Sequence, residues 1–275
     1  MPELPEVETI RRSLEQNIKG KTFMGAEVFL EKMVKGVSPL ELNSELKGRE
    51  ITRIDRRGKY LIIHLTGGIA MVIHLRMTGQ LLYCSPEQEK VRHTHIIFKL
   101  SDMCQLRFAD QRQFGKISLV SVRELDNFPG LKGLGVEPLG ETFSREFFKK
   151  ELRNRRTKIK PLLLDQTFIA GIGNIYADEA LFRAMINPER IASSLTPREA
   201  SRLYLAIRTV LQEGIENKGT SIKDYVDGDG NKGSNQGNLR VYGREGEPCV
   251  KCGKEIKRKS IGGRSSHFCP KCQKL

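Results

Sequence analysis

The sequence predicts an α+β protein of several domains, in which a β-rich region precedes a helical region and a small cysteine-rich module. Three observations lead to this prediction. Short apolar runs with polar or glycine punctuation fill residues 22–122, helical periodicity fills residues 144–219, and two Cys-x-x-Cys pairs lie near the C-terminus. A chain of 275 residues, 38% of them hydrophobic, is long enough to bury more than one core.

The opening residues MPELPEVETI predict a helix from Pro5 to about Lys19. Proline suits the first helical turn because its missing N–H would be unpaired there, and Gly20 ends the pattern. The apolar residues that share one face of this helix are Val7, Ile10, Leu14 and Ile18. Pro2 and Glu3 stand just outside the helix and have no evident structural role.

The β-rich region predicts two packed antiparallel sheets in a sandwich, because its strands follow one another closely without helices between them. The runs are TFMGAEVFL, KYLIIHL, IAMVIHL, QLLYC, HIIFKL, QLRFA and KISLV.

The second half of the chain predicts a linker followed by helices. We place a domain with the N-terminal helix and the sandwich at residues 1–130 and a glycine-rich linker at 131–143. A helical domain follows at 144–238, with helices in SREFFKKELRN, KIKPLLLDQ, NIYADEALFRAM and TPREASRLYLAIRTVLQEGIENKG. Residues 219–238 are polar and rich in glycine and asparagine, which indicates a mobile and functional loop.

The charge of the chain indicates a polyanionic partner, either nucleic acid or an anionic membrane surface. The formal net charge is +14, and residues 240–275 hold ten Lys and Arg against three Glu, a local charge of +7. No apolar run approaches the roughly 20 residues that span a bilayer, and the acid-rich start is unlike a signal peptide. We therefore expect a cytoplasmic, nucleoid-associated protein.

The C-terminal cysteines predict a zinc ribbon at residues 239–275. Cys249-x-x-Cys252 and Cys269-x-x-Cys272, sixteen residues apart, have the spacing of a four-thiolate site that holds one structural Zn²⁺. Two disulfides are the alternative, and the absence of a secretory signal disfavours them. Arg264 follows two glycines where the hairpin between the pairs should turn, and an arginine there can bind phosphate or remain a solvated charge.

Cys84 and Cys104 lie in strand patterns outside this module. We expect them to be buried hydrophobic residues.

Five segments together carry a family resemblance: MPELPEVETI, HLRMTG, DQRQFG, LLLDQTFIAGIGNIYADEALF and the cysteine ribbon. In order and spacing the chain resembles the bacterial formamidopyrimidine-DNA glycosylases over its whole length. The resemblance implies an N-terminal β-sandwich, a helix-two-turn-helix domain and a zinc finger. It departs from the family pattern at Gln113, where a second basic residue is usual, and at Ser265-Ser266, where Gly-Thr is common.

The resemblance implies an enzyme of base excision repair that removes 8-oxoguanine and formamidopyrimidines and then cleaves the strand by β,δ-elimination. Once Met1 is removed, the secondary amine of Pro2 would form the Schiff base. Its reference pKa of roughly 8 leaves more neutral amine at pH 7 than a lysine near 10.4. The other implied catalytic residues are Glu3, Glu6, Lys59 and Arg264.

The resemblance also implies residues that contact DNA. Met77, Arg112 and Phe114 match positions that fill the space left by the flipped base, and Asn174 matches a donor at a helix start. Further matched positions, for which ordinary structural roles remain open, are His74, His93, Arg156, Lys160, Tyr242 and Arg258.

The implied partner is damaged double-stranded DNA, bound by a monomer without membrane contact. Two alternatives stay open. One is an oxidised-pyrimidine glycosylase of the endonuclease VIII type, although that relative starts Met-Pro-Glu-Gly-Pro where this chain has Leu4. The other is a non-catalytic zinc-ribbon protein that binds DNA or RNA.

Overall fold

The computed structural model describes residues 1–275, which form two compact units. The first unit contains residues 1–132 and 217–236, and the second contains residues 133–216 and 237–275. The glycine-rich loop that the sequence places with the helices therefore lies almost entirely in the first unit.

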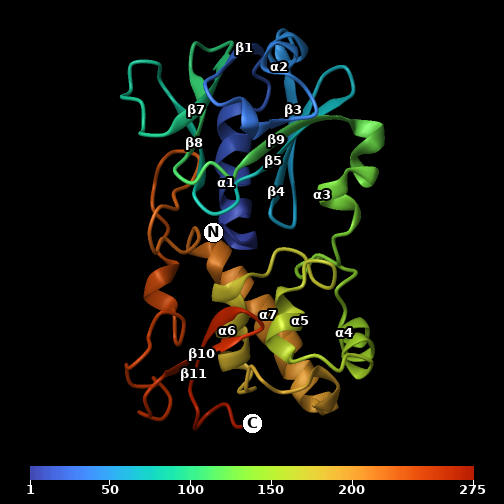
Figure 1. Cartoon of the computed structure of the whole chain (residues 1–275), viewed down its shortest axis with the longest axis vertical. Helices are drawn as coiled ribbons and strands as arrows, with labels where there is room; N and C mark the ends of the chain where they lie inside the picture. Colours follow the sequence, from blue (N-terminus) through green and yellow to red (C-terminus); the bar gives the residue numbers. More distant parts are fainter. The chain divides into compact units, whose positions relative to one another are not determined.

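The first unit is built around helix α1 (Leu4–Ile18). The predicted helix is present, with Glu3 at its N-cap, Pro5 in its first turn, and the four predicted apolar residues buried. The helix contacts β3 (Ile51–Arg57) and β4 (Tyr60–Leu65) of one sheet and β6 (Gly79–Cys84) of the other, and Figure 1 shows strands on both sides of its ribbon. The start of α1 is thus anchored by the core of the unit.

Two sheets form the predicted sandwich around this helix. One has the strand order β1-β7-β8-β6, and the other has the order β2-β9-β5-β4-β3. The strands are β1 (Phe23–Val28), β2 (Val34–Lys35), β3 (Ile51–Arg57), β4 (Tyr60–Leu65), β5 (Ile69–His74), β6 (Gly79–Cys84), β7 (Thr94–Leu100), β8 (Gln105–Asp110) and β9 (Lys116–Ser121). A single apolar cluster, which includes Phe98 from the first sheet and Ile63 from the second, joins the two sheets.

The structure corrects the β prediction in two respects. The short β2 pairs in parallel with β9, so the second sheet is not purely antiparallel. The helix α2 (Pro39–Leu46) and the strand β3 were not predicted. Only Ile51 and Ile54 of β3 are buried, because it is an edge strand, and its charged sequence therefore shows little apolar rhythm.

The remaining elements of the first unit are short. They are the 3₁₀ helices η1 (Glu31–Met33) and η2 (Val122–Asn127) and the helix α3 (Pro129–Lys132).

The second unit contains the predicted helices. They are α4 (Arg145–Arg153), α5 (Ile159–Leu164), α6 (Asn174–Arg183) and α7 (Pro197–Glu216), with the 3₁₀ turn η3 (Ala192–Ser194) between the last two. Another 3₁₀ turn, η4 (Asn235–Asn238), marks the passage between the units. Helix α6 packs against α7 and α5, and it also contacts the C-terminal hairpin.

The C-terminal hairpin pairs β10 (Lys257–Ile261) with β11 (Arg264–Phe268). Its two-residue turn, Gly262-Gly263, has φ values of 57° and 74°, as a type I′ turn requires. A Cβ on Gly262 would also meet the ring of Pro161 at 2.8 Å. The predicted turn is present, and it places Arg264 at the tip of the finger.

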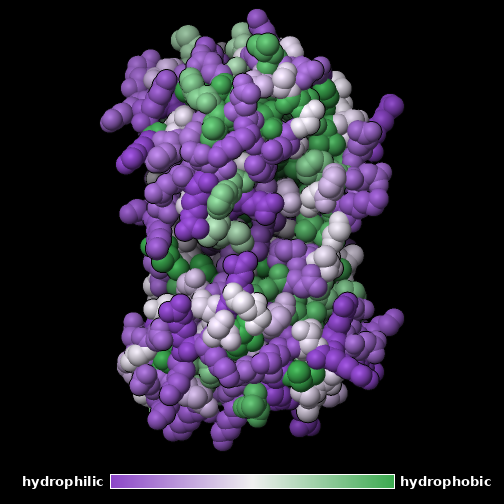
Figure 2. Space-filling model, in the orientation of Figure 1, coloured by the Kyte–Doolittle hydropathy of each residue, from purple (hydrophilic) through white to green (hydrophobic).

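The face shown in Figure 2 is mostly hydrophilic, with hydrophobic residues scattered among the polar ones. The helices include none with the length and apolar character that crossing a membrane requires.

Candidate active site and nucleic-acid interface

The N-terminal candidates Pro2, Glu3 and Glu6 are all buried at the start of α1. Glu6 uses its two carboxylate oxygens differently. Oε2 accepts a hydrogen bond from the Glu3 backbone N–H at 2.8 Å, and Oε1 accepts one from the Thr220 N–H at 2.8 Å. Glu6 therefore links the start of α1 to the segment 217–236. Through these two contacts its carboxylate positions the loop relative to the helix.

The segment 217–236 has a defined conformation in the first unit, although its composition predicts a mobile loop. The buried Tyr225 donates from its hydroxyl to the Lys218 carbonyl at 3.1 Å, and burial raises the pKa of this phenol. The N–H of Gly228 donates to Ser13 Oγ of α1 at 2.9 Å, while its carbonyl accepts from the Tyr83 N–H at 2.8 Å. The loop is thus attached to α1 and to β6.

Lys59 and His74 lie together where β4 begins and β5 ends, beside the turn between β3 and β4. Lys59 is buried and follows Gly58. The positive φ of Gly58, 56°, allows the two-residue turn that joins β3 to β4. The His74 ring packs edge-on against Tyr60, with ring centroids 4.4 Å apart. Burial, assisted by the charges of Arg76 and Lys59, lowers the pKa of His74 to about 3.

The neutral His74 has a fixed hydrogen-bonding pattern. Its Nδ1 lies 2.9 Å from the Arg76 backbone N–H and must act as the acceptor. The proton of the neutral ring is therefore on Nε2, where it can be donated.

Met77, Arg112 and Phe114 are brought together by two neighbouring turns. Met77 and Phe114 are both exposed, at 40% and 54%, which is unusual for large apolar side chains. Arg112 Nη1 lies 3.1 Å from Met77 Sδ. His93 is half-buried, and its carbonyl accepts from the N–H of Asp110, at the base of the Arg112 turn.

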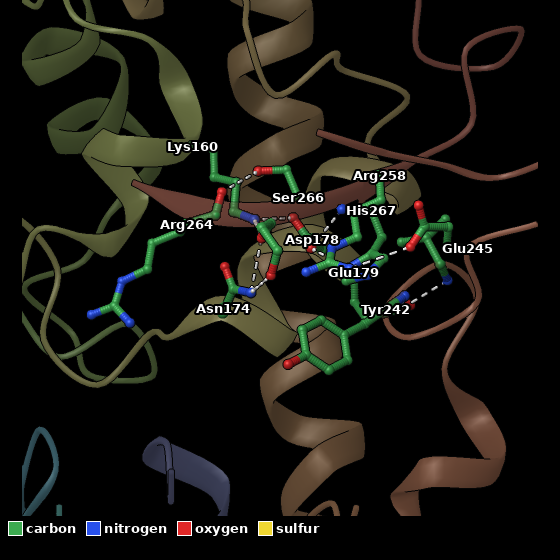
Figure 3. Close-up of polar contacts among 12 residues, drawn as sticks. Lys160, Asn174, Asp178, Glu179, Tyr242, Glu245, Arg258, Arg264, Ser266 and His267 are labelled. Carbon is green, nitrogen blue, oxygen red and sulfur yellow. Dashed lines mark hydrogen bonds and ion pairs between the residues drawn. The ribbon is translucent and has the colours of Figure 1, made fainter. Parts of the chain in front are cut away.

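In the second unit, Lys160 and Asn174 hold the backbone next to Arg264 (Figure 3). The ammonium of Lys160 is completely buried, 2.6 Å from Asp178 Oδ1 and 2.6 Å from the Ser265 carbonyl. Asn174 Nδ2 donates to the same carbonyl at 2.9 Å. A side chain so buried has no access to DNA, so Lys160 acts in this structure by positioning the finger.

Asp178 and Glu179 are adjacent acids of α6 that the sequence analysis did not single out. Asp178 Oδ2 accepts from the His267 N–H of β11 at 2.9 Å. Glu179 accepts from the N–H groups of Arg240, Val241 and Tyr242 at 2.9–3.0 Å. Burial raises the pKa of Glu179, although these three donors favour its charged form.

The signal that could have identified these acids is their position inside the apolar helix sequence IYADEALF, where a buried carboxylate needs partners.

The remaining predicted DNA contacts differ in exposure. Arg156 is exposed, Tyr242 is half-buried with its ring packed against His267, and Arg258 forms a half-exposed ion pair with Glu245 at 3.5 Å. Arg264 is exposed and points away from the other labelled residues in Figure 3. Its guanidinium is available for an anion.

The four predicted cysteines form a zinc site. Their sulfur atoms all lie within 4.8 Å of one another, and two of the separations are 3.9 Å and 3.5 Å. Tetrahedral zinc with Zn–S bonds of about 2.3 Å requires S···S distances of about 3.8 Å, so the four thiols fit one structural Zn²⁺. A small core of Phe182, Val241 and Ile256 supports the site.

The other two cysteines, Cys84 and Cys104, are unpaired. Cys84 is buried as predicted, whereas Cys104 is half-buried.

Three family models match consecutive parts of the chain. The formamidopyrimidine-DNA glycosylase N-terminal domain matches residues 1–117, and the H2TH domain of the same enzymes matches residues 134–226. The zinc finger found in FPG and IleRS matches residues 246–275.

Curated relatives match over their whole length. The formamidopyrimidine-DNA glycosylase of Pelotomaculum thermopropionicum is 58% identical over 275 residues, covering 100% of both chains. That of Desulforamulus reducens is 53% identical, covering 100% of this chain and 99% of its own.

Solved structures agree with these matches. A Lactococcus lactis FPG mutant in complex with Fapy-dG-containing DNA is 40% identical, with a TM-score of 0.94 and full coverage of both chains. The Lactococcus lactis Fpg bound to DNA with an abasic site has a TM-score of 0.93 at 40% identity and covers 99% of this chain and 100% of its own. The chain therefore belongs to the formamidopyrimidine-DNA glycosylase family.

Proposed function

We propose that this chain is a bifunctional DNA glycosylase and abasic-site lyase that removes 8-oxoguanine and formamidopyrimidines through Pro2. The observation that carries the proposal is the placement of Pro2 and Glu3. Both are buried at the N-cap of α1, directly before Glu6, which binds the segment 217–236. With Met1 attached, the Pro2 nitrogen in this structure is an amide; removal of Met1 would turn it into a secondary amine at a position that is buried among protein groups.

In the proposed chemistry, one nucleophile serves both base excision and strand cleavage. The neutral amine of Pro2 attacks the sugar C1′, and the bond from C1′ to the damaged base breaks as the base leaves with a proton. Protonation of O4′ then lets the C1′–O4′ bond break, so that the sugar ring opens and the nitrogen forms a cationic iminium with C1′, which acidifies the C2′ hydrogen. Loss of that proton expels the 3′ phosphate, and a second elimination expels the 5′ phosphate.

The other catalytic roles are those that the family resemblance implies, and the chemistry of each side chain is compatible with them. Glu3, adjacent to the amine, serves as the acid and base that opens the deoxyribose ring. Lys59 contacts the phosphate of the damaged nucleotide and supplies a proton during β-elimination. Arg264, exposed at the finger tip, binds the flanking phosphates.

The duplex is held open by the exposed cluster of Met77, Arg112 and Phe114. Met77 and Phe114 are apolar wedges for the gap left by the flipped base. Arg112 can donate two hydrogen bonds to the acceptor edge of an unpaired cytosine, whereas adenine presents a donor there. We therefore expect excision of 8-oxoguanine opposite cytosine and poor excision opposite adenine.

A substrate within the chromosome implies action in the cytoplasm, on the nucleoid. The domains assigned from the sequence remain part of this proposal: a catalytic domain at 1–130, a linker at 131–143, a helix-two-turn-helix domain with a lesion-recognition loop at 144–238, and a zinc finger at 239–275.

Borohydride trapping tests the proposal. The protein lacking Met1 should form a covalent adduct with an 8-oxoguanine:cytosine duplex, and mass spectrometry should locate the adduct on Pro2. A variant with one residue added before Pro2 should bind the same duplex but trap sharply less. Full trapping by a chain that retains Met1 would refute the assignment, and preferential trapping on an oxidised-pyrimidine duplex would favour the endonuclease VIII activity.

A further inference from the structure

Asp110 is a buried carboxylate at the junction of the two turns that carry the exposed cluster. It is the last residue of β8 and is only 1% exposed. Its Oδ1 accepts from Thr78 Oγ1 at 2.5 Å and from the Arg112 backbone N–H at 3.2 Å, and its Oδ2 accepts from the Gly115 N–H at 2.7 Å. All of these donors are neutral, and Asp110 forms no ion pair.

These contacts join one turn to the other. Thr78 belongs to the turn between β5 and β6, next to Met77. The Thr78 hydroxyl oxygen also accepts from the Arg112 N–H, at 3.0 Å. The hydroxyl therefore joins the turn that contains Met77 to both the Asp110 carboxylate and the turn that contains Arg112. The turn is tightly packed at Gly115, where a Cβ would lie 2.5 Å from the ring of Phe108. The relative position of Met77 and Arg112 is thus set by Asp110 and Thr78.

The same contacts keep the Arg112 guanidinium available. Asp110 binds the backbone of Arg112 and leaves its side chain without a carboxylate partner. The guanidinium hydrogen bond in the structure goes to the Met77 thioether, which is a weak acceptor that a base edge can replace. A buried acid that paired with the guanidinium would instead withdraw it from DNA.

We propose that Asp110, together with Thr78, is a positioning residue that sets the opposite-base selectivity of the enzyme. The proposal rests on the proposed function, in which Arg112 reads the orphan base. Asp110 holds the two turns so that the wedge Met77 and the reader Arg112 enter the duplex as one unit.

Two isosteric variants test this role. Asp110→Asn replaces one acceptor oxygen by an amino group that cannot accept from an N–H, and Thr78→Val removes the hydroxyl. Asp102→Asn is the control for loss of a carboxylate elsewhere in the β7–β8 hairpin: Asp102 accepts from the Tyr83 hydroxyl and the Cys104 N–H, pairs with Lys21, and touches neither of the two turns. Thermal melting establishes that each variant is folded.

The first readout is the ratio of kcat/KM for 8-oxoguanine opposite cytosine to that opposite adenine. Asp110→Asn and Thr78→Val should each lower this ratio about tenfold, towards the value for Arg112→Ala, and Asp102→Asn should keep it. The double variant Asp110→Asn/Arg112→Ala should have a ratio no lower than Arg112→Ala alone. Equal losses opposite both bases, or effects that multiply in the double variant, would overturn the proposal.

The second readout separates this proposal from the proposed function. A duplex with 2-aminopurine opposite a tetrahydrofuran abasic site reports wedge insertion by fluorescence, without any reaction. If Arg112→Ala keeps the full cytosine preference, Arg112 is not the reader, and the fluorescence change then decides the role of Asp110. A smaller change with Asp110→Asn and Thr78→Val supports positioning, and a wild-type change with both refutes it.

Discussion

Buried acids in this chain serve mainly as acceptors for backbone N–H groups. Glu6, Asp110 and Glu179 are each at most 6% exposed, and each accepts from at least two backbone N–H groups. These hydrogen bonds offset part of the desolvation cost of a buried carboxyl group and fix the backbone that it binds. The three acids fix, respectively, the 217–236 loop, the turns of the exposed cluster and the start of the finger.

At the residue scale, His74 should remain neutral throughout the physiological pH range. Burial and the charges of Arg76 and Lys59 lower its pKa to about 3, against about 6.5 when unfolded. Below pH 6.5 the unfolded chain binds a proton that the folded chain does not, so this residue reduces stability as the pH falls from about 6.5 towards 3 and has no effect above. Histidine NMR should show one ring that does not titrate between pH 8 and 5.

The unfolded chain in urea provides the reference for this measurement, since all its histidines should titrate near pH 6.5. Assignment of an ordinary titration near pH 6.5 to His74 in the folded protein would contradict the burial argument. A neutral ring can donate a hydrogen bond from Nε2 without adding charge, so DNA affinity should not depend on the titration of His74 between pH 8 and 5.

At the scale of elements, the finger should depend on Glu179 as well as on zinc. Glu179→Gln replaces a carboxylate oxygen at the N–H groups of residues 240–242, and we expect a loss of about 1–3 kcal/mol in unfolding free energy. Zinc content should remain at one ion per chain, because the four cysteines are unchanged. Thermal melting and metal analysis on the same sample measure both quantities.

Glu213→Gln is the matched control, since Glu213 forms an exposed ion pair with Arg183 and should contribute at most about 1 kcal/mol. Loss of zinc from Glu179→Gln would show that the carboxylate supports the metal site rather than the attachment of the finger to α6.

The 217–236 loop should recognise the base rather than cut the strand. Replacing residues 222–232 by a short Gly-Ser linker leaves the Thr220 N–H on Glu6 and removes the rest of the loop, including the contacts of Tyr225 and Gly228. Excision of 8-oxoguanine should then fall much more than cleavage at a preformed abasic site, where no base needs recognition. Equal losses on the two substrates, measured by gel assay, would rule out a recognition role.

The sequence predicted those elements that a short stretch of residues marks, either by the spacing of its apolar residues or by glycine, proline or cysteine at set positions. Helix α1, the longer strands, the Gly262-Gly263 turn and the zinc ligands all have such signals. It could not predict β3, whose edge position leaves few buried residues, nor the parallel pairing of β2, which depends on contacts distant in sequence.

The residues of the candidate site also fall into two groups, those that motifs in the sequence indicate and those whose partners come together only in the folded chain. Residue types and motifs indicated Pro2, Glu3 and Arg264, and the family resemblance that these motifs carry implied their roles. Lys160 was matched to a DNA-contacting position, and its burial could not be predicted because its partners Asp178 and Ser265 come from other elements. Asp110 was not singled out, because only the folded chain brings Thr78 to it.

At the scale of the whole molecule, the net charge of +14 should make DNA binding steeply dependent on salt. Each phosphate contact that releases a counterion adds about 0.9 to the slope of log affinity against log salt. Arg264→Ala should therefore reduce the slope by about 1 and weaken binding to damaged and undamaged duplexes alike. Arg190→Ala is the control, since Arg190 is already paired with Glu199 at 3.2 Å. Fluorescence anisotropy between 50 and 200 mM salt measures both slopes. An Arg264→Ala variant with weaker binding but the wild-type slope would show that Arg264 acts through finger geometry and not through phosphate.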